Sequence, residues 1–168
     1  LETEALLADL TSFVPGRRLD DDCQIFLRYR GGAKGRLWAS QVAVGNENEL
    51  RLRVYGEKAG LEWLQSNPNQ LWFTPLGEPK RLLTRNGAGT WDEAARVSRI
   101  PGGHPEGYLE AFATIYREIA DALVAARNGL SPDGAVVFPS VQDGLHGMRF
   151  IEAAVASSRG GNVWTNVG

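Results

Sequence analysis

The sequence predicts an α+β fold, because a stretch with strand periodicity precedes a stretch with helix periodicity. Up to about residue 85, apolar and polar residues alternate, most clearly at residues 50–55, as they do in half-buried β-strands. Beyond residue 105 the apolar residues recur every three or four positions, as on one face of an α-helix. Strands followed by helices indicate a sheet with helices on one side. We therefore expect a large, open, predominantly antiparallel (mixed) sheet with its helices packed on one face.

The strands are predicted where turn-forming segments interrupt the alternation. Residues 30–35 contain three glycines, which tolerate the positive φ angles of a reversing turn, and they predict a hairpin. Residues 56–60 and 75–79 are interpreted as turns for similar reasons. The expected strands are one at the N-terminus and others at residues 23–29, 36–44, 50–55, 71–74, 81–84 and 162–167, with one more starting at residue 61.

A long amphipathic helix is predicted from about residue 105 to residue 127. Pro105 suits the first helical turn, because the N–H that proline lacks would have no partner there. Asn128-Gly129 is a C-terminal stop signal. The face expected to be buried consists of Tyr108, Phe112, Ile115, Tyr116, Ile119 and Leu123.

A second helix is predicted directly after Ser140. The serine hydroxyl is a suitable N-cap, and Asp143 stands three residues later, where a carboxylate supports the first turn. Gly160-Gly161 marks the end of the helix. The residues expected to be buried on this helix are Leu145, Met148, Ile151 and Val155.

The composition argues against several classes of protein. The 168 residues carry 18 basic and 20 acidic side chains, interspersed along the chain, and no basic stripe of the kind that nucleic-acid binding needs. No apolar run approaches the ~20 residues that cross a bilayer, and no signal-peptide pattern opens the chain. The single cysteine, Cys23, suits a reducing compartment. We expect a cytoplasmic protein with neither nucleic acid nor membrane as a partner.

The sequence contains no motif that would make the chain a self-contained enzyme. His104 and His146 are too far apart in sequence to predict a metal-ligand pair, and HExxH, CxxC and GxxxxGK[ST] motifs are absent. The glycine pairs at residues 31–32 and 102–103 lack the strand–GxGxxG–helix context of dinucleotide binding, so we interpret them as turns. No catalytic, cofactor-binding or metal-ligating residue is predicted in this chain.

Three polar residues are candidates for contact with a small-molecule substrate: Asn46, Asn48 and His104. His104 precedes a predicted helix, whose first N–H groups favour a polar acceptor. The alternative is a surface residue that caps the helix or packs against the loop before it. Asn46 and Asn48 belong to an amide-rich loop, and amides both donate to and accept from hydroxyl-rich ligands. The alternative there is an ordinary hairpin loop whose amides serve the turn.

The tryptophans in the predicted sheet, Trp38, Trp63 and Trp72, also have two interpretations. Their rings could stack on a sugar, but aromatic residues at alternating positions of a sheet more often belong to a core or an interface. If the helices cover one face of the sheet, the other presents residues such as Trp38 to a partner. We therefore expect a homo-oligomer formed through the sheet face.

Four segments of the chain together resemble one known family. They are residues 104–112 (HPEGYLEAF), 143–158 (DGLHGMRFIEAAVASS), 39–42 (ASQV) and 53–63 (RVYGEKAGLEW). Their residues, order and spacing are similar to those in the C-terminal half of the glucose-fructose oxidoreductase/inositol dehydrogenase (Gfo/Idh/MocA) family. The resemblance covers nearly the whole chain.

The resemblance implies an oxidoreductase whose N-terminal domain binds NAD or NADP and which transfers hydride to or from a sugar, inositol or related polyol. Residues 1–168 would be its C-terminal substrate and oligomerisation domain, with the nucleotide-binding domain absent from this chain. The start at Leu1, without an initiator methionine, agrees with this expectation. This domain would contact its own N-terminal domain and supply one wall of the substrate site, and the full-length enzyme would form dimers or tetramers.

The catalytic motifs of that family do not match this chain. In the family a catalytic lysine lies in a Glu-Lys-Pro motif, and an Asp and a His about four residues apart follow. Lys58 is followed by alanine and falls in a predicted hairpin, so the lysine role is not carried over to it. We expect the chain alone to be inactive. The alternative is a non-enzymatic carbohydrate-binding or assembly module, and a GxGxxG unit encoded upstream of Leu1 would exclude it.

Overall fold

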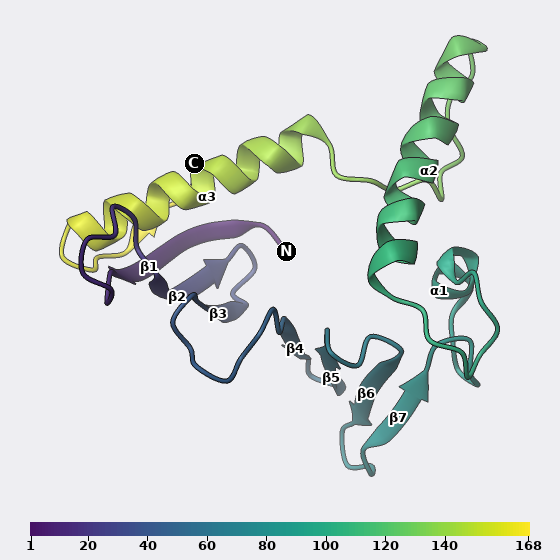
Figure 1. Ribbon diagram of the computed structural model, residues 1–168, viewed down its shortest axis with the longest axis horizontal. Helices are drawn as coiled ribbons and strands as arrows, with labels where there is room; N and C mark the ends of the chain where they lie inside the picture. Colours follow the sequence, from purple (N-terminus) through teal and green to yellow (C-terminus); the bar gives the residue numbers. More distant parts are fainter. The chain divides into compact units, whose positions relative to one another are not determined.

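The chain divides into two compact units in the computed structural model, which describes residues 1–168. Unit 1 comprises residues 1–46 and 139–168, and unit 2 comprises residues 47–138. The two units together contain eight strands and three helices, and Figure 1 labels most of them. The predicted α+β class is confirmed, and every strand pairing is antiparallel. No helix combines the length and the apolar character that crossing a bilayer would require.

Unit 1 is a four-stranded sheet with one helix. Its strands lie in the order β3-β2-β1-β8, so the last strand of the chain pairs with the first. The strand β8 is short and pairs only with Ala5 and Leu6 of β1. The elements of this unit are β1 (Thr3–Thr11), β2 (Asp22–Tyr29), β3 (Lys34–Ser40), β8 (Thr165–Asn166) and α3 (Val141–Arg159).

The helix α3 covers one face of this sheet through small side chains. Ala153 and Ala154 form the core of the unit together with Leu6, Ala8, Ile25 and Leu27 of the strands. The expectation that Leu145, Met148 and Ile151 are buried is wrong, since all three are exposed. The stripe at Ala153, Ala154 and Ser157 is buried instead, because small residues let the helix approach β1 closely.

Two serines of α3 complete the hydrogen bonding of β1 where β8 has ended. Ser157 Oγ accepts a hydrogen bond from Ala8 N at 2.9 Å and donates one to Val163 O at 2.6 Å. Ser158 Oγ accepts from Leu10 N at 3.2 Å. A buried N–H without a partner would be costly, so the serines take over the role of a longer neighbouring strand.

The start of α3 agrees with the sequence. Ser140 Oγ accepts a hydrogen bond from Asp143 N, and the Asp143 carboxylate accepts from Ser140 N at 2.7 Å. These two bonds form a capping box, which satisfies two N–H groups of the first turn. The hydrogen bonds from Ser140 lower the pKa of Asp143.

Unit 2 is an antiparallel meander followed by two helices. Its strands lie in the order β4-β5-β6-β7, so each pairs with its neighbour in sequence. The strands thus form two sheets of four, one in each unit, where we expected one large sheet. Residues 41–50, which connect β3 to β4, are not in a strand. The elements are β4 (Arg51–Tyr55), β5 (Ala59–Leu64), β6 (Gln70–Pro75), β7 (Arg81–Thr84), α1 (Asp92–Val97) and α2 (Tyr108–Arg127).

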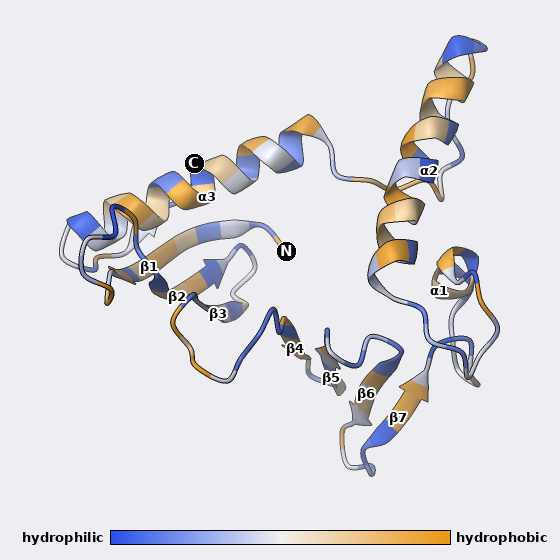
Figure 2. Cartoon of the chain, in the orientation of Figure 1, coloured by the Kyte–Doolittle hydropathy of each residue, from blue (hydrophilic) through white to orange (hydrophobic).

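The helix α2 begins later than predicted and is buried on a different side. It starts at Tyr108 and not near Pro105, and it ends at Arg127 as expected. Figure 2 shows hydrophobic residues recurring along it, yet Tyr108, Phe112 and Tyr116 are exposed. The buried residue of α2 is Glu118, whose carboxylate pairs with Arg96 of α1 at 2.6 Å. The short helix α1, which we did not predict, supplies this partner, and the hydrogen bond from Arg96 lowers the pKa of Glu118.

The loop before α2 is held by one arginine. Arg85 follows β7, and its side chain pairs with Glu106 at 2.7 Å, with both side chains largely buried, at 15% and 6% exposed. The same guanidinium donates to Asn69 Oδ1 at 2.7 Å. Its remaining hydrogen bonds go to three carbonyl oxygens of the loop, those of Ile100, Pro101 and His104.

The carboxylate of Glu106 binds the first residues of the same loop. It accepts hydrogen bonds from Arg99 N at 2.8 Å and from Ile100 N at 3.3 Å. The backbone N–H of Glu106 donates to Asn69 Oδ1. These contacts keep residues 99–107 folded back as a loop, and they explain why the helix does not begin at Pro105. The first turn of α2 is instead supported by Glu110, whose carboxylate accepts from Gly107 N at 2.9 Å.

We predict that Glu106→Ala destabilises the protein by about 3 kcal/mol or more, because it leaves the buried Arg85 guanidinium without its counter-charge. Glu78→Ala is the matched control, since Glu78 pairs with Arg81 in an exposed pair on the same unit, and its loss should cost about 1 kcal/mol or less. Urea unfolding of both variants measures the difference. Equal effects of the two substitutions would contradict a special role for the buried pair.

Candidate functional site

The loop that Arg85 holds forms one wall of a hollow in unit 2. The hollow has a volume of about 410 Å³ and lies between the β5–β6 turn and the start of α2. The amide side chains of Asn67, Asn69 and Gln70 line it together with prolines and backbone. Amide groups both donate and accept, which is how proteins distinguish hydroxyl-rich molecules. The lining residues are Ser66, Asn67, Pro68, Asn69, Gln70, Pro105, Glu106 and Gly107.

His104 lies on the same loop, directly before the residues that line this hollow. Its side chain is exposed, and its carbonyl oxygen accepts a hydrogen bond from Arg85 Nη2 at 2.7 Å. It does not cap α2, because the helix starts four residues later with Gly107 as its N-cap. The structure therefore places His104 on an anchored loop with its side chain exposed.

The two predicted asparagines lie on the segment that joins the two units. Asn46 is the last residue of unit 1, where its N–H closes a turn onto Ala43 O at 3.1 Å. Asn48 is an exposed residue of unit 2. The amides that lie beside the His104 loop come instead from the β5–β6 turn, above all from Asn69. We did not predict this turn, although Asn67-Pro68-Asn69 is a turn-forming sequence that could have indicated it, and the loop that it faces is distant in the sequence.

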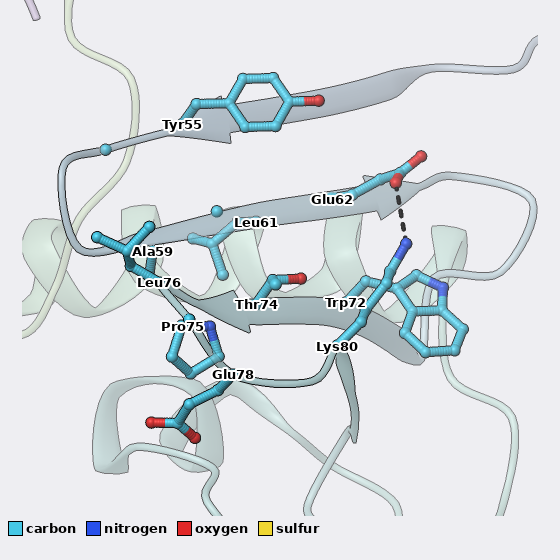
Figure 3. Close-up of a pocket in the computed structure, with 13 residues that line it drawn as sticks. Tyr55, Ala59, Leu61, Glu62, Trp72, Thr74, Pro75, Leu76, Glu78 and Lys80 are labelled. Carbon is cyan, nitrogen blue, oxygen red and sulfur yellow. Dashed lines mark hydrogen bonds and ion pairs between the residues drawn. The ribbon is translucent and has the colours of Figure 1, made fainter.

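A second hollow, of about 460 Å³, lies at the end of the unit 2 sheet where the β4–β5 and β6–β7 turns meet. Figure 3 shows Tyr55, Thr74 and Trp72 around it, with Lys80 reaching across to Glu62. The Lys80 ammonium lies 4.6 Å from the centre of the Trp72 ring, a cation–π distance. Strand register explains the grouping, since Glu62 of β5 stands opposite Trp72 of β6 and both point to one face.

The charges of this second hollow are arranged around one carboxylate. Glu62 accepts from Lys80 Nζ at 3.3 Å and lies within 3.4 Å and 3.7 Å of Arg53 Nε and Arg51 Nε. The hydrogen bond from Lys80 is the main cause that lowers the pKa of Glu62. A carboxylate held ionised among three cations is a poor general base, because its proton affinity is reduced. This cluster suits recognition or structural support better than proton transfer.

The three tryptophans of the predicted sheet lie in three different places. Trp38 is 60% exposed, and its indole N–H donates to Asp22 Oδ1 at 2.9 Å on the open face of the unit 1 sheet. Trp63 donates to Pro68 O at 3.1 Å and thereby holds the β5–β6 turn. Trp72 supports Lys80 in the second hollow. None of the three is part of a buried core.

The side chains offer little for metal or covalent chemistry. No group of three or more His, Cys, Asp or Glu side chains is placed to hold a metal ion. Burial raises the pKa of the Cys23 thiol, which disfavours the reactive thiolate. Lys58 is exposed in the β4–β5 turn, and its backbone oxygen accepts from Leu76 N. The two hollows are lined by groups that can hydrogen-bond a polar ligand.

Comparison with known proteins places the whole chain in one family. Residues 2–167 match the model of the oxidoreductase family, C-terminal alpha/beta domain. The chain is 35% identical over 167 residues to the uncharacterized oxidoreductase YfiI of Bacillus subtilis (strain 168), covering 98% of this chain and 42% of that protein. The chain thus spans less than half the length of this relative.

Solved structures show the same relationship. An oxidoreductase from Sinorhizobium meliloti is 57% identical with a TM-score of 0.94, over 98% of this chain and 46% of that one. An inositol dehydrogenase homologue from Azotobacter vinelandii, in complex with NADH and myo-inositol, is 35% identical with a TM-score of 0.90, over 98% of this chain and 44% of that one. The resemblance inferred from the sequence is therefore confirmed: the chain belongs to the Gfo/Idh/MocA oxidoreductase family and corresponds to its C-terminal alpha/beta domain.

Proposed function

We propose that the chain is the C-terminal domain of a cytoplasmic NAD- or NADP-dependent oxidoreductase that acts on a sugar, inositol or related polyol. The observation that carries this proposal is the 35% identity, over 98% of the chain, to an inositol dehydrogenase homologue that binds NADH and myo-inositol. In this proposal the coenzyme binds to an N-terminal nucleotide-binding domain that precedes residue 1 in the full-length protein. The domain described above lines the substrate pocket and forms the subunit interface.

The polar residues suit a pocket wall better than a catalytic centre. Hydroxyl-rich substrates are distinguished by directed hydrogen bonds, and an exposed His104 on an anchored loop offers one. Asn46 and Asn48 offer further amides on the exposed segment between the units. The proton relay and the hydride acceptor are assigned to the part of the enzyme outside this chain, because the chain lacks the Glu-Lys-Pro motif and no group of its side chains is placed to hold a metal ion.

We predict that residues 1–168 alone bind neither NAD nor NADP and oxidise no polyol, whereas the full-length protein reduces a coenzyme in the presence of inositol or a related sugar. The reason is that dinucleotide binding needs a glycine-rich turn that leads from a strand into a helix N-terminus. Calorimetric titration of the short chain with each coenzyme is the measurement. A micromolar dissociation constant would place the coenzyme site within this domain and contradict the proposal.

We predict further that the domain self-associates through the open face of the unit 1 sheet. That face lies opposite α3 and carries Phe26 and Trp38, which are 57% and 60% exposed. Large exposed aromatic side chains on a sheet face mark an interface, and a two-fold dimer should bury more than ~1,000 Å² in total. Sedimentation equilibrium of the wild type and of Trp38→Glu tests this. A wild-type monomer at high micromolar concentration would refute the interface.

Another prediction concerns His104 in the full-length enzyme. His104→Ala should lower kcat/KM for the polyol about tenfold, as expected for the loss of one polar contact, and leave coenzyme affinity unchanged. His146→Ala is the matched control, since His146 lies on α3 in unit 1. If His104→Ala instead lowers the melting temperature and leaves the kinetics intact, the residue is structural and does not contact substrate.

A further inference from the structure

We propose that Arg85 is a positioning residue, which holds the loop of residues 99–107, and with it His104, in a single conformation that is ready for substrate. This inference rests on the proposed function, because it assigns Arg85 a role through His104. Arg85 itself lies under the loop with only 15% of its side chain exposed, so it is placed to act on the loop and not on a ligand.

The geometry accounts for every donor of the guanidinium. Nε donates to Asn69 Oδ1, Nη1 faces Ile100 O and Glu106 Oε2, and Nη2 faces Pro101 O and His104 O. A guanidinium has five N–H donors in a rigid planar fork, and here it has five acceptors. Three of them are loop carbonyl oxygens, and the one that belongs to His104 is among the shortest, at 2.7 Å.

The loop needs such an anchor because its own sequence is permissive. It contains Gly102 and Gly103, the second with a positive φ of 84°. Glycines increase the number of conformations that a free loop can adopt, and each ordered residue then costs conformational entropy. Arg85 and Glu106 clamp the loop on both sides of these glycines, since Glu106 holds Arg99 N and Ile100 N and Arg85 holds His104 O.

The anchor also shapes the hollow at the start of α2. Asn69 and Glu106, which line the 410 Å³ hollow, are both bonded to Arg85. Arg85 directly follows β7, and its backbone N–H donates to Asn69 O at 3.0 Å. The sheet therefore fixes the backbone of Arg85, from which the guanidinium extends to both residues. A loop that is already ordered before substrate binds loses less conformational entropy on binding, so its contact with substrate contributes more to affinity and to rate.

Hydrogen exchange tests the anchor without reference to activity. In the full-length protein, Arg85→Lys keeps a positive charge beside Glu106 but replaces the planar fork by a point charge. We expect the amides of Arg99, Ile100 and Glu106 to exchange at least tenfold faster, with those inside α2 and β6 unchanged. Arg81→Lys is the control, since Arg81 is an exposed arginine on the strand that precedes Arg85. Unchanged loop exchange, or a uniform rise throughout unit 2, would overturn the anchoring role.

A double-mutant cycle in the same protein tests the link to His104. Arg85→Lys and His104→Ala should each lower kcat/KM for the polyol about tenfold, whereas the double variant should be no worse than His104→Ala alone, because both changes remove one contact. If the losses in kcat/KM of the two single variants multiply in the double variant, Arg85 acts independently of His104 and the proposal is overturned. So would a loss with Arg85→Lys when His104→Ala has no effect. A wild-type enzyme without coenzyme-dependent polyol turnover would instead refute the proposed function, while the exchange measurement still decides the anchor.

Discussion

The buried pair of Arg85 and Glu106 is the interaction on which the second half of unit 2 depends. Burying two charges is costly, and the cost is offset only when their hydrogen-bonding groups find partners. Here the partners are the loop carbonyl oxygens, two loop N–H groups and the Asn69 side chain. The pair therefore specifies one loop conformation, and that conformation decides where α2 can begin. The exposed His104 and the hollow beside Asn69 both follow from it.

The elements that the sequence predicted well are those with local causes. The capping box at Ser140, the stop at Asn128 and the strand β4 each depend on residues a few positions apart, and all are confirmed. The half-burial that the alternation in β4 predicted is wrong, since all five of its residues are exposed. The errors have non-local causes. Helix α2 starts late because Glu106 is bound to Asn69, which is 37 residues away in the sequence. The buried stripe of α3 was misjudged because Ser157 is held by Ala8, from the opposite end of the chain.

In the candidate site, too, residues with a local sequence signal were found and residues brought together by the fold were not. His104 and the amide-rich segment at Asn46 and Asn48 were found because helix starts and amide clusters are visible in sequence, and their role in binding stays a prediction. Arg85, Asn69 and Glu106 were missed because each is unremarkable in its own segment. Only the fold brings them within hydrogen-bonding distance, and the same is true of Glu62, Trp72 and Lys80 around the second hollow.

Unit 2 is inserted in the middle of unit 1, which has a consequence for the order of folding. All strand pairs of unit 2 are hairpins between neighbours, so residues 47–138 can form their sheet as soon as they leave the ribosome. Strands β1 to β3 of unit 1 are also neighbours in the sequence, but this unit can be completed only later, because Ala5 pairs with Asn166 and Ala8 with the Ser157 hydroxyl. Until residues 157–166 are synthesised, β1 exposes an unpaired edge. A chain truncated before residue 157 would keep that edge open and should be prone to aggregation.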